Sequence, residues 1–263
     1  QTIHDIRSVS LENSSLKKIV SRYFHSSAIK RANTIITVSD TMKSEILKSF
    51  PYASISRIYN GIDMDSFKDV NLNNSSELRS RLKLPKKFLL SVGHFEERKN
   101  YSKLIEAIKH LQGDGIFYQL VIIGNDNGSK SLLQKKINSM GLENSIRLLS
   151  DIGTNDFKLI YNMCEYFIFP SFYEGFGIPI LEAMASGKSM ALSDIPVFQE
   201  ITQGNYTYFD PNDSYSIASS IKELLNSPEH VKNSIIYGRN RIHNFDFKNI
   251  AYEVKALYLA SYE

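Results

Sequence analysis

Two glutamates, Glu174 and Glu182, lie eight residues apart around a glycine-rich loop that runs into a helix. The uncharged stretch Tyr166–Phe169 predicts a buried strand before the loop, and Pro179 is typical of a first helical residue. Such a junction directs backbone N–H groups toward one point, where the helix dipole favours an anion. A phosphate with a hydroxyl-rich group on each side would fit, and a nucleotide sugar has that layout. The alternative is structural, because an early helical glutamate also complements the dipole and a loop glutamate can simply be solvated.

A second loop that could bind an anion follows the predicted strand 88–92. Gly93 allows the backbone to approach a ligand closely, and Arg98 and Lys99 supply two cations. Arginine offers a planar fork for phosphate oxygens, whereas lysine is a point charge. Adjacent basic residues are often only solvated, but a position just after the first strand of a domain favours ligand binding. A third loop, 124–128, is predicted to be only a turn.

Short uncharged strands alternate with helices through the middle of the chain. The predicted strands are 88–92, 119–123, 146–149, 166–169 and 189–192, and the predicted helices between the first four are 101–111, 131–140 and 155–163. This alternation is typical of a parallel sheet with helices on both faces, the doubly wound α/β (Rossmann-like) class. Ligands of such sheets bind at the carboxyl ends of the strands, where both candidate loops lie.

The first 70 residues predict part of a second Rossmann-like domain. Their predicted elements are a helix 16–31, a strand 34–38, a helix 40–50 and a strand near 55–59. A complete domain needs on the order of 100 residues. A polar stretch at 71–76 is predicted to be a loop. We therefore divide the chain into an incomplete N-terminal domain (1–70), a Rossmann-like domain (71–245) and a C-terminal helix (246–263) that crosses back to the first domain.

The composition is that of a globular protein. Of 263 residues, 42% are hydrophobic and 22% are charged, and no apolar run reaches the length of a membrane span. The single cysteine, Cys164, excludes an internal disulfide and lacks the local signature of a nucleophile, which favours a structural role and a cytoplasmic location. A net charge of +3 suits anionic small molecules or the inner face of a membrane, and it gives no indication of nucleic-acid binding.

The predicted helix 16–31 interleaves basic and apolar side chains. The basic residues are Lys17, Lys18, Arg22, Lys30 and Arg31, and the apolar ones include Ile19, Val20, Tyr23 and Phe24. This pattern fits either a helix lying on a membrane surface or an ordinary amphipathic helix with a solvated face.

Several motifs, taken in their order along the chain, resemble those of family 4 retaining glycosyltransferases of the two-Rossmann-domain (GT-B) type. They are Ile36-Thr37-Val38-Ser39, Asn60-Gly61-Ile62-Asp63, Val92-Gly93 followed by Arg98-Lys99-Asn100, the segment from Glu174 to Glu182, and Phe209-Asp210-Pro211. The resemblance extends over nearly the whole chain.

The resemblance implies a donor site for a nucleotide-diphosphate sugar, with a GDP-sugar favoured, and no cofactor. Glu182 would hold the donor ribose and Glu174 the transferred sugar, while Arg98 and Lys99 would hold the diphosphate. The other donor-binding residues would be Gly93, Gly175, Phe176, Gly177 and Ile178. His4 resembles the acceptor-side histidine of the family, so the implied catalytic residues are His4, Glu174, Arg98 and Lys99. The Asp63-Met64-Asp65 pattern lies far along the chain from the phosphate loops, and we predict no metal site there.

The expected function is transfer of a hexose, mannose first, from a nucleotide sugar to a glycan or lipid-linked glycan acceptor in bacterial surface polysaccharide synthesis. The alternative is a nucleotide-sugar-binding half-enzyme that is inactive alone or needs a partner chain. The first domain of the family should begin with a glycine-rich loop and several strands, and none precedes Gln1. A GT-B-like epimerase or phosphorylase lacks support, since no pyridoxal-type lysine site is evident.

Overall fold

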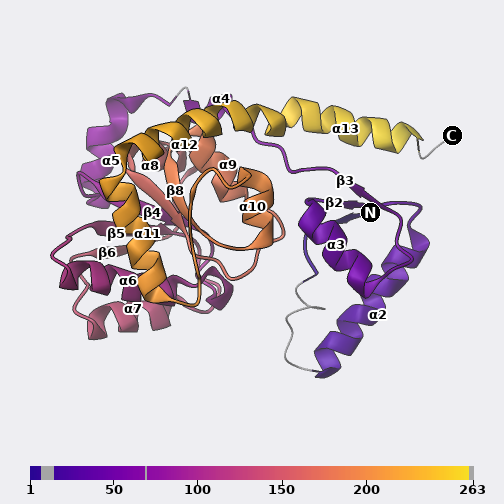
Figure 1. Ribbon diagram of the computed structural model, residues 1–263, viewed down its shortest axis with the longest axis horizontal. Helices are drawn as coiled ribbons and strands as arrows, with labels where there is room; N and C mark the ends of the chain where they lie inside the picture. The colour runs from indigo at the N-terminus through magenta and orange to yellow at the C-terminus, as the bar shows by residue number, and fades with distance from the viewer. Residues whose placement is uncertain (7–14, 69, 261–263) are drawn as a thin grey trace.

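The larger part of the protein is a parallel six-stranded sheet (Figure 1). The computed structural model describes residues 1–6, 15–68 and 70–260. The strands of this sheet are β4 (Phe88–Val92), β5 (Gln119–Ile123), β6 (Ile146–Leu149), β7 (Tyr166–Phe169), β8 (Ser189–Ser193) and β9 (Thr207–Phe209), in the order β6-β5-β4-β7-β8-β9. The order of the strands reverses between β4 and β7, and ligands of doubly wound sheets bind beside such a switch point. The predicted α/β class is confirmed.

Helices cover both faces of this sheet, as expected for parallel strands whose two sides are apolar. One core contains residues of α6 (Tyr101–Gly113), α7 (Lys130–Ser139) and α11 (Ser214–Asn226). The other contains residues of α5 (Ser75–Leu82), α8 (Thr154–Met163), α9 (Ile178–Ala185) and α10 (Pro196–Thr202), with α12 (Pro228–Arg241) packed on α9. Cys164 is buried and donates to the Tyr161 carbonyl at 3.1 Å, and burial raises its pKa to about 12, which supports its structural role.

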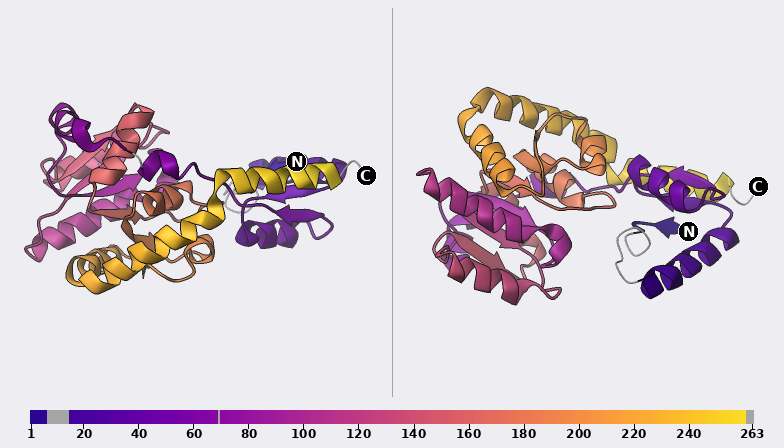
Figure 2. Two further views of the ribbon diagram at one scale, coloured as in Figure 1. Left: turned by 90° about the horizontal axis from the view of Figure 1, so that it is seen from above. Right: turned by 60° about the horizontal axis from the view of Figure 1, so that its bottom comes forward.

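A smaller parallel sheet forms the N-terminal part. Its strands are β1 (Thr2–Ile3), β2 (Ile35–Thr37) and β3 (Ile55–Arg57), in that order, and its helices are α2 (Ser15–Arg31) and α3 (Asp40–Ser49). The last helix, α13 (Phe247–Ala260), extends from the larger part along the smaller one (Figures 1 and 2), where Ile250 packs on Ile36 and Ile58.

Two chain segments run side by side where the larger and smaller parts meet. Ile62 donates to the Phe245 carbonyl at 2.8 Å, and Phe247 donates back to the Ile62 carbonyl at 3.1 Å. A Cβ at Gly61 would lie 2.8 Å from the Phe247 Cα, so only glycine allows this close approach. Tyr59 and Phe176 pack against Phe245 beside this crossing.

Three elements of the larger part differ from the sequence-based expectations. The stretch 71–76, predicted to be a loop, contains a 3₁₀ turn (Leu72–Asn74) and the first residues of α5, whose Leu78 is buried in the core. The short helix α10 and the strand β9 were not predicted, since seven and three residues are too few to show a period. The remaining short helices are α4 (Asp65–Lys68) and the 3₁₀ turns Glu97–Lys99 and Ile242–Phe245.

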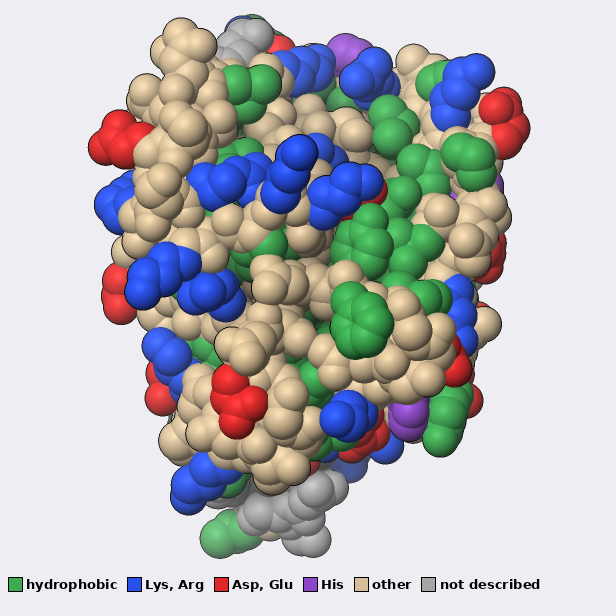
Figure 3. All heavy atoms as spheres, turned by 90° about the vertical axis from the view of Figure 1, so that its left-hand side faces the viewer, with side chains coloured by type: hydrophobic (Ala, Val, Ile, Leu, Met, Phe, Trp, Pro, Cys, Tyr) green, Lys and Arg blue, Asp and Glu red, His purple; other side chains and the backbone are tan. Residues whose placement is uncertain are grey.

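No helix among the described residues is both long and apolar enough to cross a membrane. On the side of the molecule away from the three-stranded sheet, Lys and Arg side chains form a band with apolar side chains beside it (Figure 3). Acidic side chains are scattered over the same face.

Candidate active site

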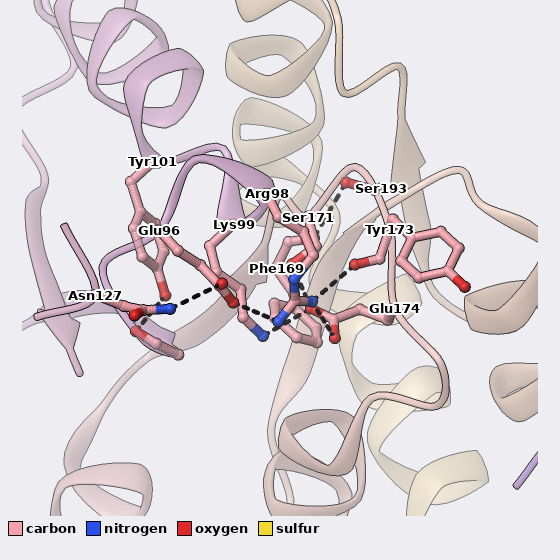
Figure 4. Close-up of polar contacts among 11 residues, drawn as sticks. Glu96, Arg98, Lys99, Tyr101, Asn127, Phe169, Ser171, Tyr173, Glu174 and Ser193 are labelled. Carbon is pink, nitrogen blue, oxygen red and sulfur yellow. Dashed lines mark hydrogen bonds and ion pairs between the residues drawn. The ribbon is translucent and has the colours of Figure 1, made fainter. Parts of the chain in front are cut away.

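The two candidate loops meet at the carboxyl ends of β4 and β7, which are neighbours in the sheet. The Arg98 guanidinium nitrogen Nη1 lies 2.7 Å from Glu174 Oε2, and the Lys99 ammonium lies 2.7 Å from Glu174 Oε1 (Figure 4). Lys99 and Glu174 are 75 positions apart in the chain. The fold therefore brings these three predicted site residues into direct contact, and we call them the Arg98–Lys99–Glu174 cluster.

Lys99 is held in a nearly dry position. Its side chain is only 8% exposed, and its ammonium lies 5.1 Å from the centre of the Phe169 ring. Gly93, at φ +150°, makes room for the lysine stem, because a Cβ there would lie 2.8 Å from Lys99 Cε. Burial lowers the pKa of Lys99, and the nearby Glu174 carboxylate opposes that effect. A desolvated ammonium of this kind interacts strongly with any anion that reaches it.

Arg98 is fixed by contacts at both ends of its fork. Nη1 donates to the Tyr173 carbonyl at 2.8 Å, and Nη2 pairs with Glu96 Oε1 at 2.5 Å. Burial acts to lower the pKa of Arg98, but the ion pairs with Glu174 and Glu96 raise it overall, so the guanidinium stays charged. A guanidinium fixed in this way can receive a phosphate without first losing conformational entropy.

The Glu174 carboxylate accepts hydrogen bonds from several donors at once. Besides Lys99 and Arg98, Ser171 donates its hydroxyl to Oε1 at 2.7 Å. Together with Glu96, which pairs with Arg98, the Arg98–Lys99–Glu174 cluster carries two acids and two cations and therefore no net charge. Any anion that binds here must therefore share these cations with the carboxylates that hold them in position.

The glycine loop passes close to the N-terminal part of the chain. A Cβ at Gly175 would lie 2.0 Å from the His4 carbonyl oxygen, and the Ser39 hydroxyl donates to the Gly175 carbonyl at 2.9 Å. The His4 backbone is thus beside the loop, while its side chain is exposed. Gly177, at φ +111°, precedes the first residue of α9, Ile178. Phe176 between them is buried. The predicted donor-binding residues of this loop, Gly175 to Ile178, therefore connect Glu174 to the start of α9.

Glu182 lies on the second turn of α9, and its Oε2 accepts the Tyr161 hydroxyl at 2.7 Å. Burial raises the pKa of Glu182 to about 7, although the Tyr161 hydrogen bond and the charge of Lys99 both act to lower it. The interaction with Lys99 places Glu182 in the same electrostatic environment as the cluster. Near neutral pH the carboxyl group can accept or donate a hydrogen bond, depending on its protonation.

Replacing Glu182 by glutamine should stabilise the protein at alkaline pH. The pKa of this carboxyl rises from 4.5 to about 7 on folding, so the folded state binds its proton more tightly, and stability from this group falls as pH rises through that window. For Glu182→Gln we expect a gain of about 3 kcal/mol in the free energy of unfolding at pH 8, shrinking toward pH 4.5. Urea unfolding of the variant, with the exposed-site control Glu229→Gln, measures it. An equal effect at both pH values would contradict the assignment.

The sequence alone did not identify several residues of the site. Ser171 and Glu96 lie within the two motif segments, three residues before Glu174 and two before Arg98, so their spacing was a usable signal. Tyr161 comes from α8, and only the fold shows that it reaches Glu182. Asp63 is not part of the site: it accepts from Ser66 N–H near the start of α4. Within the described ranges, no group of three or more His, Cys, Asp or Glu side chains could hold a metal ion.

Comparison with known proteins gives consistent matches. The family model described as "Glycosyl transferases group 1" matches residues 75–241. The "O-antigen chain mannosyltransferase RfbU" of Salmonella typhimurium is 30% identical over 251 residues, which cover 95% of this chain and 66% of that protein. The "O-antigen chain mannosyltransferase B" of Escherichia coli is 28% identical over 264 residues, covering 94% and 66%. The chain thus spans just under two thirds of the length of these two curated relatives.

Solved structures share the fold. Anabaena Alr3699/HepE in complex with UDP and glucose superposes with a TM-score of 0.86 at 20% identity, covering 99% of this chain and 71% of that one. Sucrose-phosphate synthase from Thermosynechococcus elongatus gives a TM-score of 0.84 at 20% identity, covering 99% and 67%. At this level of identity the likeness concerns the fold alone.

Proposed function

We propose that this chain, which belongs to the glycosyl transferases group 1 family and has the GT-B fold, binds a nucleotide-diphosphate sugar at the Arg98–Lys99–Glu174 cluster. In this proposal it transfers the hexose, with retention, to a glycan acceptor. The observation that carries this proposal is the convergence of two cations and an acid at the switch point of the sheet, beside the start of α9. In this proposal residues 71–245 form the donor domain, residues 1–70 are part of the acceptor-side domain, and α13 links the two.

Each side chain has a distinct role in the proposal. Lys99 and Arg98 hold the diphosphate, with backbone N–H groups near Phe176 and Ile178 at the start of α9. When the bond between the anomeric carbon and the diphosphate oxygen breaks, its electron pair leaves with the nucleoside diphosphate. The two cations stabilise the charge that develops on that oxygen. Glu174 holds the hexose, Glu182 the ribose, and His4 lies on the acceptor side.

The favoured donor is GDP-mannose, because the two curated relatives are named as O-antigen mannosyltransferases. The product would then be a mannose-containing surface polysaccharide. Thermal unfolding of the chain with GDP-mannose, UDP-glucose and dTDP-glucose tests the donor, and we expect the largest rise in Tm with GDP-mannose. A Tm unchanged by all three nucleotide sugars would overturn the proposed function.

A second candidate is a donor-binding half that needs a partner segment for transfer. It is a candidate because this chain matches only 66% of the length of the two curated relatives. The two candidates differ in one measurable way. The half-enzyme binds GDP-mannose but releases no GDP when a glycan acceptor is added, whereas the complete transferase releases GDP at a rate that depends on the acceptor.

We also propose that α2 lies on an anionic membrane at the cytoplasmic face, where lipid-linked acceptors would be found. Its exposed apolar side chains recur at helical spacing, and α2 contains no acidic residue. They are Leu16, Ile19, Val20, Tyr23 and Phe24. Exposed basic side chains such as Lys18 and Arg22 lie beside them.

The paired change Ile19→Ser and Phe24→Ser should weaken binding to vesicles that contain one third anionic lipid by about tenfold or more, because two apolar side chains no longer enter the interface. Co-sedimentation measures the bound fraction. The control pair Phe117→Ser and Leu132→Ser changes exposed apolar residues on the larger part and should have no effect. Basic side chains also gather on the far side of the molecule (Figure 3). Equal loss in both pairs would show that α2 is not the specific membrane surface, and no loss in the first pair would show that charge alone drives binding.

A further inference from the structure

A pocket of about 580 Å³ lies between α3, the loop after β7 and the start of α10. We call it the α3–α10 pocket. Its volume is in the range of sites for small molecules. Glu174 is part of its lining, so the pocket adjoins the Arg98–Lys99–Glu174 cluster. It therefore lies where a second substrate could meet a sugar held by Glu174.

The walls of the α3–α10 pocket differ in chemistry. Ser44 and Glu45 of α3 supply polar groups, whereas Pro196 and Val197 supply an apolar surface. Phe172 also lines the pocket and is 40% exposed. A sugar ring has hydroxyl groups around its edge and C–H groups on its faces, so it suits a site that combines carboxylates with an exposed aromatic ring.

The charge of the lining argues against a nucleotide diphosphate as the occupant. Four carboxylates line the pocket against one lysine: the acids are Asp40, Glu45, Glu174 and Glu200, and the base is Lys48. Arg98 and Lys99 already neutralise Glu174, and Arg57 lies 3.5 Å from Asp40, which leaves Glu45 and Glu200 against Lys48. The remaining negative surplus disfavours a diphosphate, whereas it does not repel a neutral polyol. Carboxylate oxygens accept hydrogen bonds from hydroxyl groups, which a glycan supplies in number.

Hydrogen bonds within the protein fix the α3 wall of the pocket to the larger part. The Glu200 carboxylate caps α3, accepting from the backbone N–H of Asp40 at 2.7 Å and of Thr41 at 2.8 Å. The Tyr173 hydroxyl donates to Glu45 Oε2 at 3.0 Å. These contacts link residues from 128 to 160 positions apart in the chain. A preformed wall lowers the entropy cost of binding a weakly held sugar.

We propose that the α3–α10 pocket binds the acceptor as a neutral saccharide, with a sugar ring against Phe172 and its hydroxyls on Glu45. The acceptor would then lie beside Glu174, within reach of the hexose that Glu174 holds. The proposal rests on the proposed transferase function, because it assigns the hexose to Glu174. It adds the place and the chemical class of the second substrate.

The test uses α-mannobiose as the saccharide probe and the variant Ser44→Trp, which fills the pocket from an exposed position on α3. Saturation-transfer NMR with GDP present should show mannobiose signals for the unchanged chain, and these should fall about tenfold or more in Ser44→Trp. GDP affinity, measured by calorimetry, should stay the same. The matched control Ser219→Trp lies at an exposed position of α11 and should change neither.

Should Ser44→Trp unfold, Phe172→Ala with the control Phe117→Ala repeats the test through an exposed ring. Mannobiose signals that persist in the pocket variants, or that are absent from the unchanged chain, would overturn the proposal. Loss of GDP binding together with mannobiose would assign the pocket to the donor and also overturn it. Failure of the transferase function is recognised separately, as absence of GDP-mannose binding to the unchanged chain.

Discussion

Replacement of Lys99 by methionine is expected to lower hexose transfer by about 100- to 1000-fold, the loss seen when one preorganised donor to a developing anion is removed. Methionine retains the unbranched apolar stem that packs between Gly93 and the Phe169 ring. The variant therefore removes the charge and leaves the packing in place. The measured quantity is kcat/KM for GDP release from GDP-mannose in the presence of acceptor.

Affinity for GDP gives a second readout for Lys99→Met that does not depend on transfer. Loss of one charge-assisted hydrogen bond should weaken binding by about 1.5–3 kcal/mol, or roughly ten- to a hundredfold in Kd. The control Lys135→Met removes an exposed lysine from α7 and should change neither quantity. If Lys99→Met binds GDP as tightly as the unchanged chain, the lysine does not hold the diphosphate.

Replacement of Glu174 by glutamine should separate the sugar from the phosphates. Glutamine keeps the size of the side chain but removes the charge that neutralises Lys99 and Arg98. We expect transfer to fall by about 100-fold, since an ionised acceptor of hydroxyl hydrogen bonds is lost. We expect GDP itself to bind equally well or more tightly, because no acid then competes for the two cations.

The comparison of GDP with GDP-mannose by calorimetry decides this second prediction. In Glu174→Gln the extra affinity that the mannose moiety gives to GDP-mannose should disappear, while the affinity for GDP should remain. Glu97→Gln is a matched control, because Glu97 lies on the same turn as Lys99 and is exposed. A parallel loss of GDP and GDP-mannose binding would show that Glu174 only supports the loop.

The parallel strands of the larger sheet could be predicted because they are short, uncharged and buried on both faces. Four of the five predicted strands, β4 to β7, have the predicted bounds, and β8 extends one residue further. The strand β9 and the helix α10 could not be predicted in the same way, because their assignment depends on packing. Phe198 of α10 stacks on Phe169 of β7, a contact that exists only after the sheet has formed.

The meeting of the two candidate loops could also be predicted, because Arg98, Lys99 and Glu174 each follow a predicted strand and parallel strands end at the same edge. The ion pairs that Glu174 forms with Arg98 and Lys99 could not be predicted, since they depend on distances between side chains from two separate loops. The capping of α3 by Glu200 could not be predicted for the same reason, because Glu200 and the first residue of α3 are 160 positions apart in the chain. Sequence order thus indicated which loops meet, and the structure shows which charges are already paired.

The most direct measurement of the central claim is a crystal structure of the chain with GDP-mannose bound. The account predicts diphosphate oxygens within hydrogen-bond distance of the Lys99 ammonium and the Arg98 guanidinium, the mannose on Glu174 and the ribose on Glu182. A nucleotide sugar bound elsewhere, with both ion pairs of Glu174 unchanged and no phosphate near Lys99, would contradict it.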